Sequence, residues 1–197
     1  MNFHLAAVQA GVQLYANAMR RWGRPMAETE DTWQQALYDH LRGMDVTLFA
    51  YVPDAGHKVL IDCSLADPDA ISVPLTTEAE GVPMLAGHHL GGGRGVLLMQ
   101  SSGVGNCVNQ FSLIRIGRFP FVTIVTMRGE FGEQNAWQMP MGQGVRPVME
   151  AMGMHCLTAD HPDEVIPTAT AAIDMAYRSN AGVGMLLGQR LLGAKAF

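Results

Sequence analysis

Short, apolar segments of strand type alternate along this chain with segments of helical periodicity, and this alternation limits the fold more than any other feature of the sequence. The ranges that predict strands are 46–51, 70–75, 95–100, 121–127, 154–157 and 183–187. Strands this apolar are expected to be covered on both faces, which is typical of a parallel sheet. We therefore predict the α/β class, with a doubly wound, mostly parallel six-stranded sheet and helices on both faces.

The segments between the predicted strands carry helical patterns, and Gly or Pro marks most of the connections. The predicted helices cover residues 32–41 (capped by Asp31 or Thr32), 57–65, 78–90, 104–116, 145–152 and 163–178. An amphipathic pattern at 4–21 predicts an N-terminal helical extension over residues 1–30, ahead of one domain at 31–197. This order fits a flavodoxin-like fold, which binds ligands beyond the carboxyl ends of its strands.

The composition argues against several classes of function. The net charge is −5 and the basic residues do not cluster, so no nucleic-acid partner is expected. No apolar run reaches the length of a membrane span and no secretory signal is evident, so we expect no membrane and a cytoplasmic protein. Three scattered cysteines are expected to be free thiols: Cys63, Cys107 and Cys156. Only 16% of the residues are charged, which favours an oligomer.

Two sequence elements stand out at the expected carboxyl edge of the sheet. Glu78 opens a mostly apolar helix, and one strand later a Gly-rich turn, Ser102-Gly103-Val104-Gly105-Asn106, opens the next helix. Each has an ordinary structural explanation, because a helix dipole favours an acid near its start and a tight turn needs glycine. Glu80 also competes with Glu78 for any role.

The order and spacing of the two elements resemble the pyrimidine-binding domain of thiamine diphosphate enzymes. In those enzymes a Glu stands nine residues before a Gly of the following helix, as Glu78 stands before Gly87, whereas Glu80 stands seven before it. The resemblance therefore implies that Glu78 is the catalytic acid that activates the cofactor by a hydrogen bond to its aminopyrimidine ring.

The Gly-rich turn resembles the Gln-Asn-Ser-Gly-Leu-Gly-Asn turn of the sulfopyruvate and phosphonopyruvate decarboxylase family. This chain departs from that pattern at Ser101, where the family usually has Asn. The resemblance implies that the pyrimidine site is lined, beside Glu78, by four residues of the turn: Ser102, Gly103, Gly105 and Asn106.

Two further loops are expected to face the substrate. The stretch from 136 to 143 is similar to a Gln-Ile-Pro-Met-Gly-Gln stretch of the family's alpha subunit, and it lies in a predicted long loop over 128–143. Its Gln138 and Gln143 would hydrogen-bond substrate oxygens. Arg128 would offer its guanidinium fork to a sulfonate or phosphonate, although a solvent-facing loop arginine is the ordinary interpretation.

The loop after the first strand, 52–57, faces the reaction centre in the resembling enzymes. Asp54 or His57 would contact substrate or relay a proton, and the alternative is a plain turn in which Pro and Asp are common. His88 and His89 are neighbours on a predicted helix and point in different directions, so we expect a structural role and no metal site there.

No Gly-Asp-Gly sequence occurs in the chain, although thiamine diphosphate enzymes use that motif, followed by an Asn, to hold the diphosphate through Mg²⁺. The resemblance therefore implies a separate diphosphate-binding beta subunit that holds the Mg²⁺ and shares the thiamine diphosphate. We expect a hetero-oligomer that also has contacts between alpha subunits.

The expected function is that of the alpha subunit of a thiamine diphosphate-dependent 2-keto acid decarboxylase. A small anionic substrate is expected, with the conversion of 3-sulfopyruvate to sulfoacetaldehyde and CO2 favoured. A phosphonopyruvate decarboxylase or a carboligase of the same family is the first alternative. A non-catalytic binding subunit on the same fold is the second, because a fold alone does not fix a function.

Overall fold

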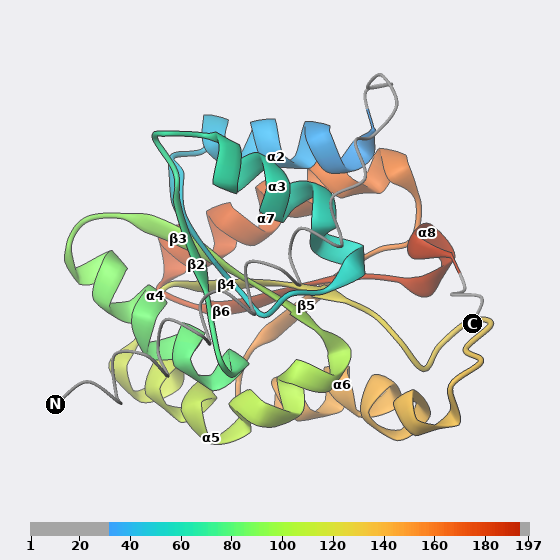
Figure 1. Ribbon diagram of the computed structural model, residues 1–197. Helices are drawn as coiled ribbons and strands as arrows, with labels where there is room; N and C mark the ends of the chain where they lie inside the picture. The colour runs from blue at the N-terminus through green and yellow to red at the C-terminus, as the bar shows by residue number, and fades with distance from the viewer. Residues whose placement is uncertain (1–31, 194–197) are drawn as a thin grey trace, which may run out of the picture. The chain divides into compact units, whose positions relative to one another are not determined.

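The computed structural model describes residues 32–193, and its centre is a six-stranded sheet in the order β2-β1-β3-β4-β6-β5 (Figure 1). All five neighbouring pairs are parallel. The strands are β1 (Val46–Tyr51), β2 (Ile71–Pro74), β3 (Arg94–Gln100), β4 (Phe121–Thr126), β5 (His155–Ala159) and β6 (Gly182–Leu187). The predicted doubly wound parallel fold is thereby confirmed. The predicted N-terminal extension over 1–30 lies outside the described residues.

In the described part of the chain, three helices cover each face of the sheet, and Figure 1 shows them on its two sides. One face carries α2 (Trp33–Gly43), α3 (Lys58–Ala66) and α7 (Pro162–Ser179). The other carries α4 (Gly81–Leu90), α5 (Ser101–Gly117) and α6 (Met139–Ala151). A short helix, α8 (Gln189–Leu192), follows β6 and was not predicted. Within residues 32–193, no helix is long and apolar enough to cross a membrane.

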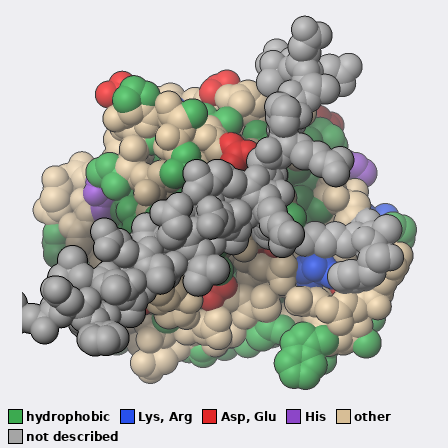
Figure 2. All heavy atoms as spheres, viewed as in Figure 1, with side chains coloured by type: hydrophobic (Ala, Val, Ile, Leu, Met, Phe, Trp, Pro, Cys, Tyr) green, Lys and Arg blue, Asp and Glu red, His purple; other side chains and the backbone are tan. Residues whose placement is uncertain are grey.

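The apolar strands are explained by burial on both faces. In β3, Val96 and Leu98 belong to the core under α2, α3 and α7, whereas Leu97 and Met99 belong to the core under α4, α5 and α6. All four side chains are fully buried. Because the central strands β1, β3, β4 and β6 are covered on both faces, polar side chains gather at the strand ends. On the face seen in Figure 2, the basic side chains of the described residues do not form a patch.

The connections place a crevice at the carboxyl ends of β1 and β3. The chain runs from β1 to β2 through α3 on one face, then returns through α4 on the opposite face to β3, which lies on the other side of β1. Such a reversal of direction is where doubly wound sheets bind ligands, since the loops on either side diverge. The predicted loop at 52–57 and the turn that carries Glu78 both lie at this edge.

Two predicted boundaries are wrong, and both errors concern glycines. The stretch 101–106 is not a separate turn, because α5 begins at Ser101 directly after β3 and includes both glycines. The predicted loop 128–143 is shorter than expected, because a 3₁₀ turn at Ala136–Gln138 leads into α6 at Met139. In both places glycine permits close packing of a helix rather than a turn.

The start of α6 packs against the preceding loop through Gly142. A Cβ atom at Gly142 would lie 1.8 Å from the carbonyl oxygen of Arg128, which is a backbone atom that cannot move aside cheaply. At Gly144, two residues further along the same helix, the nearest atom to a Cβ would be Met141 Cε at 3.7 Å, an ordinary contact distance.

The two glycines provide a matched test of this packing. We expect Gly142→Ala to lower the free energy of unfolding by about 2–3 kcal/mol, because the added methyl overpacks the loop. Gly144→Ala is expected to raise it by roughly 0.5–1 kcal/mol, because alanine is the better helix former. Urea denaturation of both variants measures the difference, and equal effects would contradict the close contact at Gly142.

Candidate active site

Glu78 lies in a 3₁₀ turn, Glu78–Glu80, between β2 and α4, and its side chain reaches the start of α5. The carboxylate is buried, and its Oε2 accepts a hydrogen bond of 2.8 Å from Nδ2 of Asn106. A Cβ atom at Gly103 would lie 2.5 Å from Oε1 of Glu78, so only glycine leaves room for this carboxylate. Three of the residues predicted for the pyrimidine site are thus brought together.

The second oxygen of Glu78 is available to a ligand. Oε1 accepts no hydrogen bond from any described residue. In the described part of the chain, the buried side-chain atoms without a partner are His57 Nδ1 and Gln138 Oε1, so Oε1 of Glu78 keeps contact with solvent. Glu80 is exposed and is bound through both oxygens to Thr76, which leaves Glu78 as the acid that faces α5.

Asp54 is the centre of a second polar group, formed where β1, β3 and β4 end. Its Oδ2 accepts hydrogen bonds from Thr126 Oγ1 at 2.8 Å and from the Gly56 amide at 3.0 Å. Its Oδ1 accepts a hydrogen bond of 3.0 Å from Nε2 of Gln100. The Ser102 hydroxyl donates in turn to Gln100 Oε1 at 3.1 Å. Ser102 therefore belongs to the group around Asp54, because it points toward Gln100 at the start of α5.

His57 does not reach the crevice, which corrects the prediction that it contacts substrate. Its side chain is fully buried, and Nε2 donates to the carbonyl oxygen of Met99 at 3.1 Å. Burial lowers the pKa of this imidazole, opposed by the nearby carboxylate of Asp54. The ring is therefore fixed to the backbone of β3 and closed off from solvent.

Arg128 follows β4, and its guanidinium fork is already occupied, contrary to the prediction that it is free for a substrate anion. Nε and Nη2 donate to the two carboxylate oxygens of Glu133, each at 2.7 Å. The exposed fractions of the two side chains are 9% and 1%. The bidentate contact holds the pKa of Glu133 down at about 2 and raises the pKa of Arg128, so both groups are ionised at neutral pH.

Glu133 anchors the whole loop between β4 and α6. Besides the two bonds from Arg128, it accepts hydrogen bonds from the amides of Gly129 and Asn135 and from Nε2 of Gln189. Gln189 also accepts from the amide of Glu130, whose carboxylate accepts from the Gln189 amide. The loop is therefore tied both to itself and to α8, through two residues that sequence reasoning missed, Glu133 and Gln189.

The other predicted residues lie around this loop. Gln138 ends the 3₁₀ turn, and its Oε1 is buried without a hydrogen-bond donor among the described residues. Gln143 is exposed in the first turns of α6. Gly105 is exposed in α5, where a Cβ atom would lie 3.2 Å from Met141 Sδ. Among residues 32–193, no hydrogen bond joins Gln143 or Gly105 to Glu78, Asp54 or Glu133.

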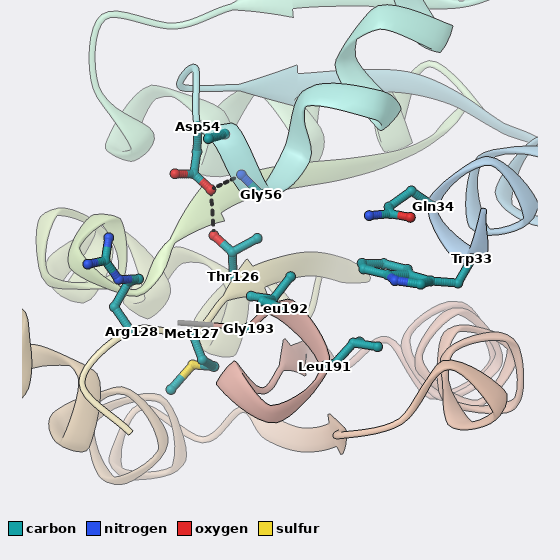
Figure 3. Close-up of a pocket in the computed structure, with 11 residues that line it drawn as sticks. Trp33, Gln34, Asp54, Gly56, Thr126, Met127, Arg128, Leu191, Leu192 and Gly193 are labelled. Atoms are coloured by element: carbon teal, nitrogen blue, oxygen red, sulfur yellow. Dashed lines mark hydrogen bonds between the residues drawn. The ribbon is translucent and has the colours of Figure 1, made fainter. Parts of the chain in front are cut away.

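A cavity of about 200 Å³ opens beside Asp54 (Figure 3). Asp54, Thr126 and Arg128 stand on one side of it, and Trp33 and Leu191 stand on the other. The carboxyl edge of the sheet thus offers a carboxylate with one open oxygen at Glu78 and a half-apolar cavity with a fixed carboxylate and an arginine. Among the described residues there is no group of three or more His, Cys, Asp or Glu that could hold a metal ion.

Known proteins resemble this chain in sequence and in fold. No protein-family model matches the chain. It is 30% identical over 154 residues to the sulfopyruvate decarboxylase subunit alpha of Methanococcus maripaludis, an alignment that covers 78% of this chain and 92% of the relative. The same subunit of Methanothermobacter thermautotrophicus is also 30% identical, and the alignment covers 78% of this chain and 93% of that subunit.

A phosphonopyruvate decarboxylase of Streptomyces viridochromogenes is 37% identical over 135 residues, which cover 67% of this chain and 34% of the longer relative. Among solved structures, a 2-oxoglutarate:ferredoxin oxidoreductase from Magnetococcus marinus superimposes with a TM-score of 0.68 at 12% identity. That match covers 82% of this chain and only 29% of the solved chain, and it bears on the fold alone. From the identity to these two alpha subunits over nearly their full length, we conclude that the chain belongs to the family of sulfopyruvate decarboxylase alpha subunits.

Proposed function

We propose that this chain is the alpha subunit of a thiamine diphosphate-dependent 2-keto acid decarboxylase that converts 3-sulfopyruvate to sulfoacetaldehyde and CO2. The observation that carries the proposal is the buried carboxylate of Glu78, with one oxygen held by Asn106 and the other open. Membership of the sulfopyruvate decarboxylase alpha subunits supports the substrate.

The residues around Glu78 fit the aminopyrimidine half of the proposed cofactor. Glycine at 103 leaves the space beside the carboxylate clear, and the Asn106 amide fixes one oxygen so that the other can point at a ring nitrogen. When bound, thiamine diphosphate supplies the electron sink that a decarboxylation requires. Glu78 would hold and exchange a proton at N1′ of the aminopyrimidine, which is the work of a general acid–base group.

The proposed active site is completed by a second chain. The 197 residues contain no Gly-Asp-Gly sequence with which to hold a diphosphate through Mg²⁺. A diphosphate-binding beta subunit would supply that half and the Mg²⁺, giving a hetero-oligomer. The relatives' designation as subunit alpha supports a partner of this kind.

The proposed substrate site is the cavity beside Asp54. The carboxylate of Asp54 is fixed by three donors and is suited to orient a substrate or relay a proton. Arg128 offers the substrate anion its Nη1, which makes no hydrogen bond within residues 32–193. The free acceptor of Gln138 and the exposed amide of Gln143 would contribute from the loop and α6.

A phosphonopyruvate decarboxylase is the second candidate, favoured by the 37% identity to the Streptomyces viridochromogenes enzyme. The two reactions differ in the anion at the far end of the same 2-keto acid skeleton. Turnover of both substrates by the reconstituted alpha–beta pair separates them, and a higher kcat/KM for phosphonopyruvate would replace the first assignment by the second.

Replacement of the proposed acid tests its role directly. We expect Glu78→Gln to reduce turnover roughly 10²–10⁴-fold, because the amide cannot exchange the proton, while the Tm stays close to that of the parent protein. Glu80→Gln is the matched control, since Glu80 is exposed and binds only Thr76 and its own turn. Near-normal turnover by Glu78→Gln would contradict the proposed function.

The space at Gly103 gives an independent test. The added methyl of Gly103→Ala would displace the Glu78 side chain, and we expect the affinity for thiamine diphosphate to fall at least about tenfold. Gly43→Ala, where no atom lies within 4 Å of the added Cβ, is the control and should bind normally. Calorimetric titration measures both variants, and unchanged binding by Gly103→Ala would place the cofactor elsewhere.

The split site is tested by titrating thiamine diphosphate and Mg²⁺ into this chain alone and into its mixture with the beta subunit. Tight binding is expected in the mixture alone, because each chain contributes half of the contacts. Tight binding to the isolated chain would contradict the need for a partner. Absence of binding to a folded complex would contradict the cofactor itself.

A further inference from the structure

The charge of Arg128 is largely balanced before any substrate arrives. Glu133 binds two of its three nitrogens, and three other donors hold this carboxylate in place. Asp54, from the loop after β1, is a second acid whose field reaches the guanidinium. The cation and the two acids together leave this part of the cavity without a positive excess.

Arg128 is also the one basic residue among those that line the cavity within residues 32–193. Its guanidinium stands on the same side of the cavity as Asp54 (Figure 3). The nitrogen left over, Nη1, is neither bonded to a described residue nor fully buried, so it is accessible to a ligand anion. An anion in this cavity therefore meets a hydrogen-bond donor without a surplus of positive charge around it.

A site without surplus positive charge discriminates between anions by their charge. The cost of removing an ion from water rises with the square of its charge, whereas the attraction to a fixed cation rises only in proportion to it. A sulfonate carries a single charge at every pH at which the protein is folded. A phosphonate resembles a phosphate group, which takes up a second charge above a pKa of about 6.

We propose that Glu133 sets the anion selectivity of the site: by balancing Arg128, it favours a monoanionic sulfonate over a dianionic phosphonate. Glu133 acts through Arg128 and is a positioning residue, since its side chain is 1% exposed and does not meet the substrate. The inference rests on the proposed function and extends it, because it assigns the choice between two substrates of one reaction to one carboxylate.

The test uses the reconstituted alpha–beta complex and the ratio of kcat/KM for sulfopyruvate to that for phosphonopyruvate. We expect Glu133→Gln to lower this ratio at least about tenfold, as expected for a charge removed within several ångströms of the anion. Glu130→Gln removes a carboxylate from the same loop, where it is exposed and bonded to Gln189, and should leave the ratio unchanged. An unchanged ratio in Glu133→Gln, or equal shifts in both variants, would overturn the proposal.

The unmutated complex gives a second test that does not depend on folding of the variants. As the pH falls from 8 to 6, the phosphonate loses its second charge, so the kcat/KM ratio should fall toward a plateau, by up to about tenfold per pH unit. Ionisations of the protein that affect both substrates equally cancel in the ratio; the acids whose fields act on Arg128 are Glu133 and Asp54. A ratio that stays flat would mean that the site accepts the dianion equally well.

A binding measurement with analogues that cannot be decarboxylated shows whether the proposed selectivity or the proposed function is wrong. Sulfoacetate and phosphonoacetate are titrated into the complex by calorimetry at pH 8. Preference for sulfoacetate that is lost in Glu133→Gln supports the selectivity even if neither keto acid is decarboxylated, in which case the function alone fails. Turnover without any preference between the two anions overturns the selectivity alone.

Discussion

Burial of the sheet on both faces is the constraint from which the rest of this molecule follows. The central strands β1, β3, β4 and β6 give their side chains alternately to two apolar cores, so neither face there has room for a charged group. Polar side chains are left to the loops at the strand ends. The reversal of chain direction between β2 and β3 then separates these loops and makes one edge of the sheet the place where ligands can bind.

Along that edge the charged groups are fixed in different ways. Glu78 is held by one hydrogen bond and a glycine contact, which leaves an oxygen open. Among the described residues, three donors hold Asp54, and Glu133 accepts five hydrogen bonds. Glu78 therefore keeps an oxygen that can take part in chemistry, whereas both oxygens of Glu133 are used in hydrogen bonds that hold the loop. Full satisfaction of Glu133 is what permits a charge to be buried there.

The sequence predicted the strands and most helices because their signals are local. Apolar runs, helical periodicity and breaking residues act over a few positions, and the six strands were recognised within about two residues at each end. The glycines misled the prediction, because Gly103 and Gly142 serve contacts with residues far from them in the chain. A glycine that admits a close approach looks, in sequence, like one that forms a turn.

The site was predictable only where a motif carried it. Glu78 and Asn106 were identified by the resemblance, and their hydrogen bond across 28 positions joins two motifs that were recognised separately. Nothing local marks Glu133 as a partner of Arg128, since the two meet through a loop shaped by positive φ angles at Gly129 and Gly132. Gln189 is 56 positions from Glu133 and follows a strand that carries no signal of polar function.

The contact between Gly142 and the Arg128 carbonyl has a consequence for motion at this edge. Because the backbone of α6 rests directly on the backbone of the residue that carries the guanidinium, with no side chain between them to absorb a displacement, the helix and the arginine must shift together. A partner chain that pressed on the exposed start of α6 would therefore move the cation and its bound carboxylate as one rigid unit. The position of the arginine would then report whether the helix is engaged.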